Sequence, residues 1–350
     1  MKNTRTMISS KRPSLRDVAK LAGVSAAAVS YVVNGRKGEV GTQATERIEA
    51  AIKQLKYQPQ RRGLSLKLNR EFAIGLVIVD PDPNFLADPF TTQVATGLST
   101  ALVEPGYGLT VTGCRELRDL EKLLKRPIGV DAFVVIASGP VEMREKVYSM
   151  LSDSNLPVIV IQESLKDSDE DICSVFQDDF DGGHRLTRHL IDGGARSFLF
   201  VSPSRDWPAI ERREKGIHSA LTDACTLTKV LCDEQDLFGT MAVVTRYLAS
   251  SPLPDAIIGA NDQIAVAVLR ALDDLGVSVP NQIQVTGYND FSFRNYVTPL
   301  LTTVTSNANA IGRSAALAIL SRLESGLFEN QTIQLPVVLN PGKTTRYNMP

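Results

Sequence analysis

Hydrophobic positions near the start of the chain recur at helical spacing. Over residues 15–22 the apolar side chains fall three or four positions apart, the period of a helix with one buried face. Ser14 stands where a helix N-cap is expected, and Gly23 allows the left-handed turn that ends a helix. The pattern predicts a short helix that begins at Leu15.

A second short helix follows directly. Ser25 can cap it, its apolar positions are Val29, Val32 and Val33, and Asn34-Gly35 ends it. Two short helices joined by a turn with Gly are typical of a helix-turn-helix. A third apolar pattern over residues 48–55 predicts the helix that covers this pair.

From residue 73 onward, short β-branched runs alternate with helical stretches. The runs are AIGLVIV, LTVT, AFVVIA and PVIVI, then SFLFVS, DAIIGA and QIQVTGY, with helical patterns near 90–104, 116–125 and 141–152. Such runs are typical of strands buried on both faces, and their alternation with helices predicts parallel sheets with right-handed crossovers. The fold class expected is an all-α helix-turn-helix head plus an α/β body of two doubly wound parallel-sheet lobes.

Charge is distributed unevenly along a chain whose formal net charge is only −1. Residues 1–70 contain fifteen Lys and Arg against four Asp and Glu, a net charge of +11, and the remaining 280 residues carry −12. A basic head on an acidic body indicates an anionic partner for the head, and DNA fits because its phosphates release counterions to clustered cations. A merely solvated basic face is the alternative.

Several classes of protein are disfavoured by what the sequence lacks. It has no apolar run of about 20 residues and no secretory core in MKNTRTMISSKRP, so we expect a cytoplasmic protein without a membrane partner. The four cysteines are scattered without zinc spacing, and no phosphate-binding, dinucleotide-binding or nucleophile-elbow motif is present. We therefore expect no metal, no cofactor and no enzymatic activity.

The segments LRDVAKLAGVSAAAVSYVVNG, VGTQATERIEAAIKQLKYQP, GGHRLTRHLIDGGARSFLFV, GANDQIAVAVLRALDDLGVSVP and VTGYNDFSFRNYVTPLLTTV occur in this order. In that order and spacing they resemble the lactose-repressor (LacI/GalR) family of bacterial transcriptional regulators, from about residue 14 to about residue 340. The resemblance implies a helix-turn-helix domain at 1–59, a hinge at 60–71 and an effector-binding and dimerisation domain of periplasmic-binding-protein type at 72–350.

The resemblance also implies how the chain passes between the two lobes of the body. The N-lobe is expected at about 72–161 and 292–322, and the C-lobe at about 162–290 and 323–346. Crossings are then expected near 161–164, 288–293 and 323–332.

In this family, three positions of the second helix commonly read base edges in the major groove. They correspond here to Ala26, Ala27 and Tyr31, so Tyr31 is the main polar reader, while alanine methyls contact only thymine methyls or let the helix sit closer. Plain helix propensity is the alternative reason for the alanines. The serines are expected at phosphates or as caps. The DNA-binding set expected for the head is Ser14, Ser25, Ala26, Ala27, Ala28, Ser30, Tyr31 and Asn34.

The stretch YQPQRRGLSLKLNREF resembles the family's hinge helix, which orders on DNA. Leu66 matches the leucine that relatives wedge into the minor groove, and Arg61 and Arg62 are expected at phosphates. Gly63 weakens an isolated helix, so the hinge is expected to depend on DNA. A flexible basic linker without a wedge is the alternative.

Ligands of open parallel sheets bind beyond the carboxyl ends of the strands, which selects the loops at 80–90, 202–208, 261–262 and 289–290. The resemblance adds Arg213, which clamps hydroxyls or carboxylates in relatives, and Asn261, an amide for sugar hydroxyls. Trp207 suits a platform under a sugar ring, with partly buried packing as the alternative. The effector-binding set expected is Phe90, Asp181, Trp207, Arg213, Asn261 and Asn289, the last at a position where relatives often have a carboxylate.

Together these features predict a homodimeric regulator that binds a pseudo-palindromic DNA operator and represses carbohydrate-use genes under control of a small-molecule effector, a sugar. A sugar-binding transport receptor of the same fold is one rival, disfavoured by the basic head. A cytoplasmic α/β enzyme with an added DNA-binding head is another, disfavoured because no nucleophile–base arrangement occurs at the cleft loops.

Overall fold

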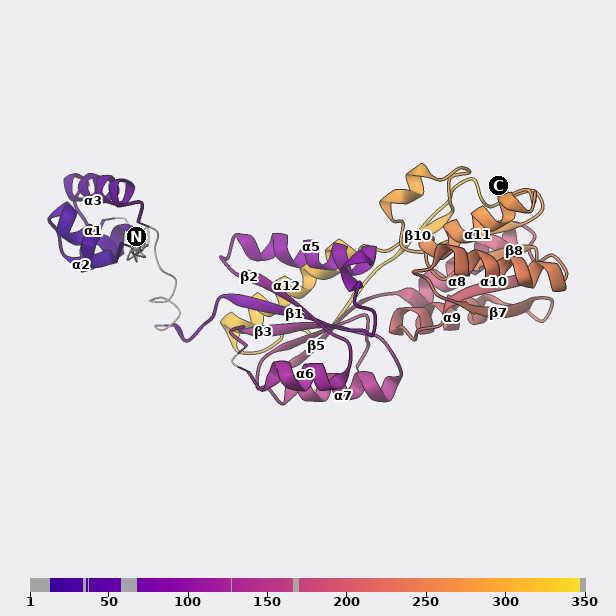
Figure 1. Ribbon diagram of the computed structural model, residues 1–350, viewed down its shortest axis with the longest axis horizontal. Coiled ribbons are helices and arrows are strands. Elements are labelled where there is room, and N and C mark those ends of the chain that lie inside the picture. The colour runs from indigo at the N-terminus through magenta and orange to yellow at the C-terminus, as the bar shows by residue number, and fades with distance from the viewer. Residues whose placement is uncertain are drawn as a thin grey trace, which may run out of the picture. The chain divides into compact units, whose positions relative to one another are not determined.

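The head and the body form separate units of the chain. The structure is a computed structural model that describes residues 13–33, 36, 38–57, 68–126, 128–165 and 170–346. Contacts divide it into Met1–Arg70, here called the head, and Glu71–Pro350, here called the body (Figure 1). Within the described residues no helix is both long and apolar enough to cross a membrane.

The described part of the head contains three helices around one small core. These are α1 (Leu15–Ala22), α2 (Ala26–Val33) and α3 (Thr42–Leu55). Each helix contributes a fully buried side chain to the core, namely Val18, Val29 and Ile48. The expected helix-turn-helix with a covering third helix is confirmed.

Local capping explains why α1 starts and stops where it does. The Ser14 amide donates to Asp17 Oδ2 at 2.7 Å, and the Asp17 amide donates to Ser14 Oγ at 3.3 Å, which makes a capping box. Gly23 ends the helix at φ 65°, in the left-handed region that glycine adopts without strain. Both signals were readable from the sequence.

The first lobe of the body contains a six-stranded sheet in the order β11-β5-β4-β3-β1-β2, with every pairing parallel. Helices α5 and α12 cover one face of this sheet, and α6 and α7 cover the other (Figure 1). The elements are β1 (Ala73–Val79), β2 (Gly108–Cys114), β3 (Ala132–Ala137), β4 (Val158–Ile161), β5 (Ile172–Gln177), β11 (Thr332–Leu335), the 3₁₀ helix η1 (Phe85–Ala87), α5 (Pro89–Val103), α6 (Leu117–Leu124), α7 (Val141–Ser152) and α12 (Ala308–Ser325).

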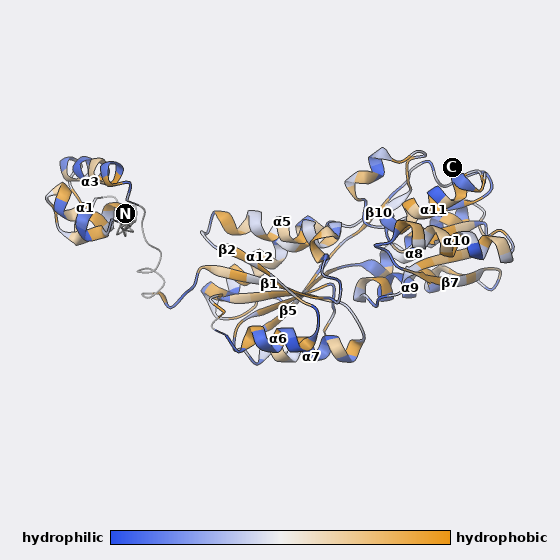
Figure 2. Ribbon diagram, viewed as in Figure 1, coloured by the Kyte–Doolittle hydropathy of each residue, from blue (hydrophilic) through white to orange (hydrophobic). Residues whose placement is uncertain are grey.

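Strand β1 shows why an apolar run becomes a central strand. Alternate side chains point to opposite faces, so Ile74 and Leu76 pack under α5 and α12 while Val77 and Val79 pack under α6 and α7. Hydrophobic residues accordingly run through the middle of the lobe (Figure 2). The expectation of double-sided burial fails for β2, which lies at the sheet edge and is largely exposed because it has a neighbour on one side only.

The second lobe contains a four-stranded parallel sheet in the order β7-β6-β8-β9, and beside it β10 pairs antiparallel with β12. Helix α8 packs against α9, and α10 packs against α11. The elements are β6 (Ser197–Pro203), β7 (Thr226–Cys232), β8 (Ala256–Gly259), β9 (Gln284–Thr286), β10 (Thr303–Thr305), β12 (Val338–Asn340), α8 (Asp179–Asp192), α9 (Pro208–Ala220), α10 (Leu237–Ser250), α11 (Asp262–Asp274) and the 3₁₀ helix η2 (Ser292–Tyr296). Two lobes built on parallel sheets are confirmed.

The connections between the lobes differ from those expected. The chain does not leave the first lobe near 161–164, because β5 pairs parallel with β4 and the crossing comes only after Gln177. It does not leave for the last time at 323–332 either, because β11 pairs with β5 and the third crossing follows Leu335. In both cases the strand pairs with the free backbone N–H and C=O groups at the edge of the first sheet before the chain crosses to the second lobe.

The second connection is longer than the expected 288–293. Phe291 and Phe293 pack against the core of the first lobe, whereas Val297, Leu301 and Val304 pack in the core of the second. The chain therefore remains beside the second lobe until β10 ends, and the first lobe resumes with α12 rather than at residue 292. The boundary between the lobes lies here because Leu301 and Val304 are buried in the core of the second lobe.

Helices α5 and α12 cross at close range because each has a glycine at the crossing. A Cβ atom on Gly97 would overlap the carbonyl oxygen of Asn309, and one on Gly312 would overlap the carbonyl oxygen of Val94. No other residue lets the two backbones approach this closely. The crossing holds the N-terminus of α5 at one rim of the cavity described below.

Candidate functional site

Helix α2 exposes a surface of small side chains on the head. Ala26 and Ala27 are exposed, and Ser25 caps the helix by accepting a hydrogen bond from the Ala28 amide at 3.1 Å. Ala28 is half-buried and packs against the head core, so it has a structural role of its own. Tyr31 is half-buried and lies 5.7 Å from the Arg36 guanidinium, within the range of a cation–π contact.

The other expected DNA-binding residues have varied positions. The Ser14 hydroxyl donates to Asp17 Oδ2 at 2.7 Å and accepts from the Asp17 amide, so it is occupied by the cap. Ser30 is half-buried on α2. The residues that lie outside the described part of the chain are Asn34, Arg61, Arg62 and Leu66.

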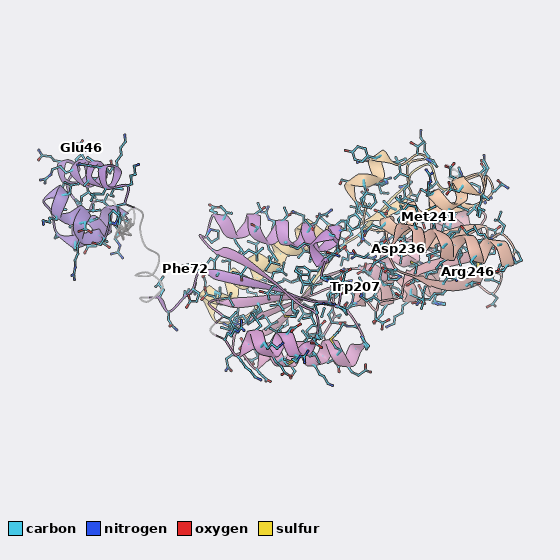
Figure 3. The ribbon with its side chains drawn as sticks, viewed as in Figure 1. Glu46, Phe72, Trp207, Asp236, Met241 and Arg246 are labelled. Carbon is cyan, nitrogen blue, oxygen red and sulfur yellow. The ribbon has the colours of Figure 1, made fainter. Side chains whose placement is uncertain are left out.

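A cavity with about 530 Å³ of unfilled space, open to solvent, lies between the two lobes of the body. Five of the six expected effector residues line it, and Trp207 stands at the junction of the lobes (Figure 3). The first lobe contributes Asp88, Phe90, Thr91 and Gln162, and the second contributes Trp207, Ala209, Ile210, Arg213, Glu234, Gln235, Asn261, Gln263 and Asn289. The loops selected by the rule that ligands bind at the carboxyl ends of parallel strands contribute residues to this cavity.

Arg213 is held rigidly at the base of the cavity. Its exposed fraction is 3%, and its Nε donates to Asp179 Oδ1 at 2.8 Å. One terminal nitrogen donates to the Ala260 carbonyl at 2.8 Å and the other to Asn289 Oδ1 at 3.0 Å. These contacts use three of the five N–H groups of a guanidinium, so Arg213 is a fixed donor whose charge is balanced by a buried carboxylate.

Asp181 does not line the cavity, contrary to expectation. It lies at the surface of α8 in an ion pair with Arg185, with Nε to Oδ2 at 2.6 Å. Asp179, two residues earlier, is fully buried and is the carboxylate that contacts Arg213. Two residues along a helix turn a side chain by roughly 200°, so the two aspartates point in opposite directions.

Trp207, Glu234 and Asn261 form a hydrogen-bonded group in the wall of the cavity. Trp207 Nε1 donates to Glu234 Oε1 at 3.0 Å, and Asn261 Nδ2 donates to Glu234 Oε2 at 2.6 Å. Burial, and then repulsion by Asp88, raise the pKa of the Glu234 carboxyl to about 7. Burial also raises the pKa of Asp88, which caps α5 by accepting from the Thr91 amide at 2.9 Å.

Sequence reasoning missed Glu234, and it did not single out Asp88 within the selected loop at 80–90. Glu234 follows β7, a largely exposed edge strand that was not predicted because Lys229 interrupts the apolar positions of its sequence TLTKVLC. With β7 assigned, the same carboxyl-end rule would have selected residues 233–236. Asp88 was available as an N-cap signal before Pro89 and Phe90.

Ion pairs join the lobes beside the cavity. Asp80, which follows β1, pairs with Arg205, which follows β6, at 2.9 Å. In a second group, the buried Arg144 of α7 pairs with Glu211 of α9 at 3.0 Å and with Glu163 at 2.9 Å. These ion pairs between the lobes depend on how the lobes are oriented relative to each other.

A helix-turn-helix head joined to a two-lobed body with a cavity between its lobes defines a DNA-binding transcriptional regulator. In the described part of the chain, no group of three or more His, Cys, Asp or Glu side chains is arranged to hold a metal ion.

Comparison with known proteins specifies the class. Residues 14–60 match the bacterial regulatory proteins of the lacI family, and residues 187–345 match the periplasmic binding protein-like domain. The chain thus combines a lacI-family DNA-binding domain with a periplasmic-binding-protein-like domain.

Similar proteins cover nearly the whole chain. The ribose operon repressor of Escherichia coli (strain K12) is 28% identical over 341 residues, which are 94% of this chain and 99% of that repressor. The transcriptional repressor PurR of Glaesserella parasuis is 28% identical over 89% of this chain and 90% of its own length.

Solved structures share the fold over a similar extent. A complex of the regulator CelR with cellobiose has a TM-score of 0.69 at 26% identity and covers 95% of this chain and 100% of its own. A Lac repressor dimer bound to operator has a TM-score of 0.82 at 24% identity, with 96% and 100% covered.

Proposed function

We propose that this chain is a homodimeric repressor of carbohydrate-use genes that binds a pseudo-palindromic operator and responds to a sugar in the cavity between its lobes. The observation that carries the proposal is the composition of that cavity. It combines an aromatic ring at Trp207, a fixed guanidinium at Arg213 and amides at Asn261 and Asn289. This is the set of groups that stacks against a sugar ring and hydrogen-bonds its hydroxyls.

The relatives support the choice of ligand and role. One is named as the repressor of a ribose operon, and another was solved in complex with cellobiose. PurR is named as a repressor without reference to a sugar, so a purine-like effector is the alternative outcome of the test below.

On the DNA side, the proposal places α2 in the major groove, with Tyr31 as the polar reader, and places Leu66 of the hinge at 60–71 in the minor groove. The exposed Ala26 and Ala27 support a close approach of the helix to the bases, since methyl groups add little bulk. Two heads on one dimer would read two half-sites, and action on the chromosome fits the cytoplasmic location expected from the sequence.

The test of the effector site uses Trp207 as both probe and target. Because it is the only tryptophan, binding of ribose or cellobiose in the cavity should change the intrinsic fluorescence of the full-length protein in proportion to occupancy. Purines serve as the competing ligand class, and DNA affinity is then measured with and without the ligand that binds.

A pair of variants separates stacking from packing. Trp207→Phe keeps an aromatic face, whereas Trp207→Leu removes it, and calorimetry measures affinity when fluorescence is lost. We expect Trp207→Leu to weaken sugar binding at least tenfold and Trp207→Phe to weaken it less. If Trp207→Leu binds the sugar as tightly as the unchanged protein does, Trp207 does not stack against the sugar ring.

On the DNA side, Tyr31→Phe removes only one hydroxyl. If that hydroxyl bonds a base, the preference at one position of each half-site should fall by about 1–3 kcal/mol. An unchanged profile of selected sequences would show that Tyr31 does not read a base.

A further inference from the structure

The charges around the cavity do not balance. Its lining contains two carboxylates, Asp88 and Glu234, and one cation, Arg213. Arg213 pairs with the fully buried Asp179 at 2.8 Å, and Asp179 also lies 3.5 Å from Arg212, so two arginines share this one carboxylate. Neither Arg212 nor Asp179 lines the cavity, so the two lining carboxylates outnumber the one lining cation, and an excess of negative charge faces the ligand.

Glu234 has no cation of its own in the described structure. Both of its oxygens accept hydrogen bonds, but the donors, Trp207 Nε1 and Asn261 Nδ2, are neutral. The charged groups that face it are Asp88 at the start of α5, which repels it, and Arg205 after β6, which attracts it. Arg205, however, pairs with Asp80 at 2.9 Å.

We propose that Glu234 makes this cavity selective for the charge of its effector, so that uncharged and amino sugars bind whereas phosphorylated and acidic sugars are excluded. This inference rests on the proposed function, because it names the chemical class of sugar that the same cavity accepts. It also resolves the role of Arg213, which donates to hydroxyl groups and does not capture a carboxylate.

The physical basis is repulsion in a partly desolvated site. A hydroxyl group can donate to the remaining lone pairs of Glu234 or Asp88, and this adds no charge. A phosphate or carboxylate brings a second negative charge close to both, where the effective dielectric is far below that of water. We expect the anionic form of a sugar to bind at least tenfold more weakly than its neutral form.

The first experiment needs no effector. Caesium, iodide and acrylamide are cationic, anionic and neutral quenchers of tryptophan fluorescence, and Trp207 is both the only tryptophan and a partly exposed wall of the cavity. At about pH 8, with each ion's quenching constant divided by its constant for free N-acetyltryptophanamide and acrylamide as the neutral control, we expect caesium to quench Trp207 at least twofold more efficiently than iodide. Glu234→Gln should reduce this ratio toward one.

Two further variants control the result. Asp233→Asn removes a neighbouring carboxylate that is exposed and does not line the cavity, so its ratio should match the unchanged protein. Asp88→Asn keeps a good N-cap for α5 and removes the second negative charge, so it should lower the ratio as Glu234→Gln does. Asp88→Asn keeps the proposal testable if Glu234→Gln folds poorly.

The same fluorescence reports the proton on Glu234. Because Trp207 Nε1 donates to this carboxylate, its emission should show a step with a midpoint near pH 7 that Glu234→Gln abolishes. The inference is overturned if iodide and caesium quench equally, or if the ratio or the pH step persists in Glu234→Gln.

The second experiment compares ribose with ribose 5-phosphate and cellobiose with cellobionic acid. The neutral member of a pair should be preferred at least tenfold, and Glu234→Gln should reduce that preference. If the preference is unchanged in Glu234→Gln, Glu234 does not select by charge. If no sugar binds while the quenching ratio behaves as expected, the sugar in the proposed function is wrong and the charge selectivity of the cavity stands.

Discussion

Replacing Arg213 by Met should destabilise the body, because the substitution leaves the buried carboxylate of Asp179 without its main cationic partner. Asp179 is fully buried, and its bond from Arg213 Nε is 2.8 Å long. Its remaining contacts are Gln177 Nε2 at 2.9 Å and the more distant Arg212 at 3.5 Å. The variant also removes the donors to Asn289 and to the Ala260 carbonyl.

The magnitude follows from the loss of one partner of a buried pair. Removing one partner of a buried ion pair lowers the free energy of unfolding by about 3–5 kcal/mol. We expect about 3 kcal/mol here, because Arg212 still compensates part of the Asp179 charge. For a domain of this size that is a fall in Tm of roughly 6–12 °C. Adding Asp179→Asn removes the stranded charge, so the double variant should be more stable than Arg213→Met alone by about 1–3 kcal/mol.

The assay is urea and thermal unfolding of the four proteins of this double-mutant cycle, followed by far-ultraviolet circular dichroism. The control is Asp274→Asn, which breaks the exposed pair of Arg270 and Asp274, 3.4 Å apart on α11, and should change stability by about 0.5 kcal/mol or less. Additive effects of Arg213→Met and Asp179→Asn would refute the reasoning, because they would show that the two residues do not interact.

Three further predictions concern other parts of the chain. Gly97→Ala should destabilise the body by about 1–3 kcal/mol, because its Cβ overlaps the Asn309 carbonyl, whereas Ser99→Ala, on the exposed side of the same helix, should be nearly neutral in the same unfolding assay. Because folding raises the pKa of Glu234 from 4.5 to about 7, the folded state binds the extra proton and stability falls as pH rises through this window, by about 1.4 kcal/mol per unit at most. Glu234→Gln should flatten that slope, and an unaltered slope would assign it to other groups. Residues 1–70 alone should fold but bind operator DNA far more weakly than the full chain, with affinity that falls steeply with salt; affinity equal to that of the full chain would show that dimer contacts in the body are not needed.

The sequence by itself determined the local features of this protein. Ser14, Gly23 and Ser25 mark helix ends because caps are made by atoms within a few residues of one another. The apolar runs marked the central strands, and their carboxyl ends located the cavity that Trp207 and Arg213 line. Each of these conclusions depends on periodicity and short-range hydrogen bonds, which any window of the chain displays.

Tertiary structure decided what depends on distant partners. The chain stays in the first lobe through β5 and again through β11 because those two strands complete each other's hydrogen bonds, across more than 150 residues of sequence. Asp179 rather than Asp181 meets Arg213 because of the face of α8 that packs inward. Glu234 joins Trp207 and Asn261 only when the ends of β6, β7 and β8 lie side by side in one sheet. No local sequence pattern predicts these contacts, because they form between segments that are far apart in the sequence and come together only when the chain packs.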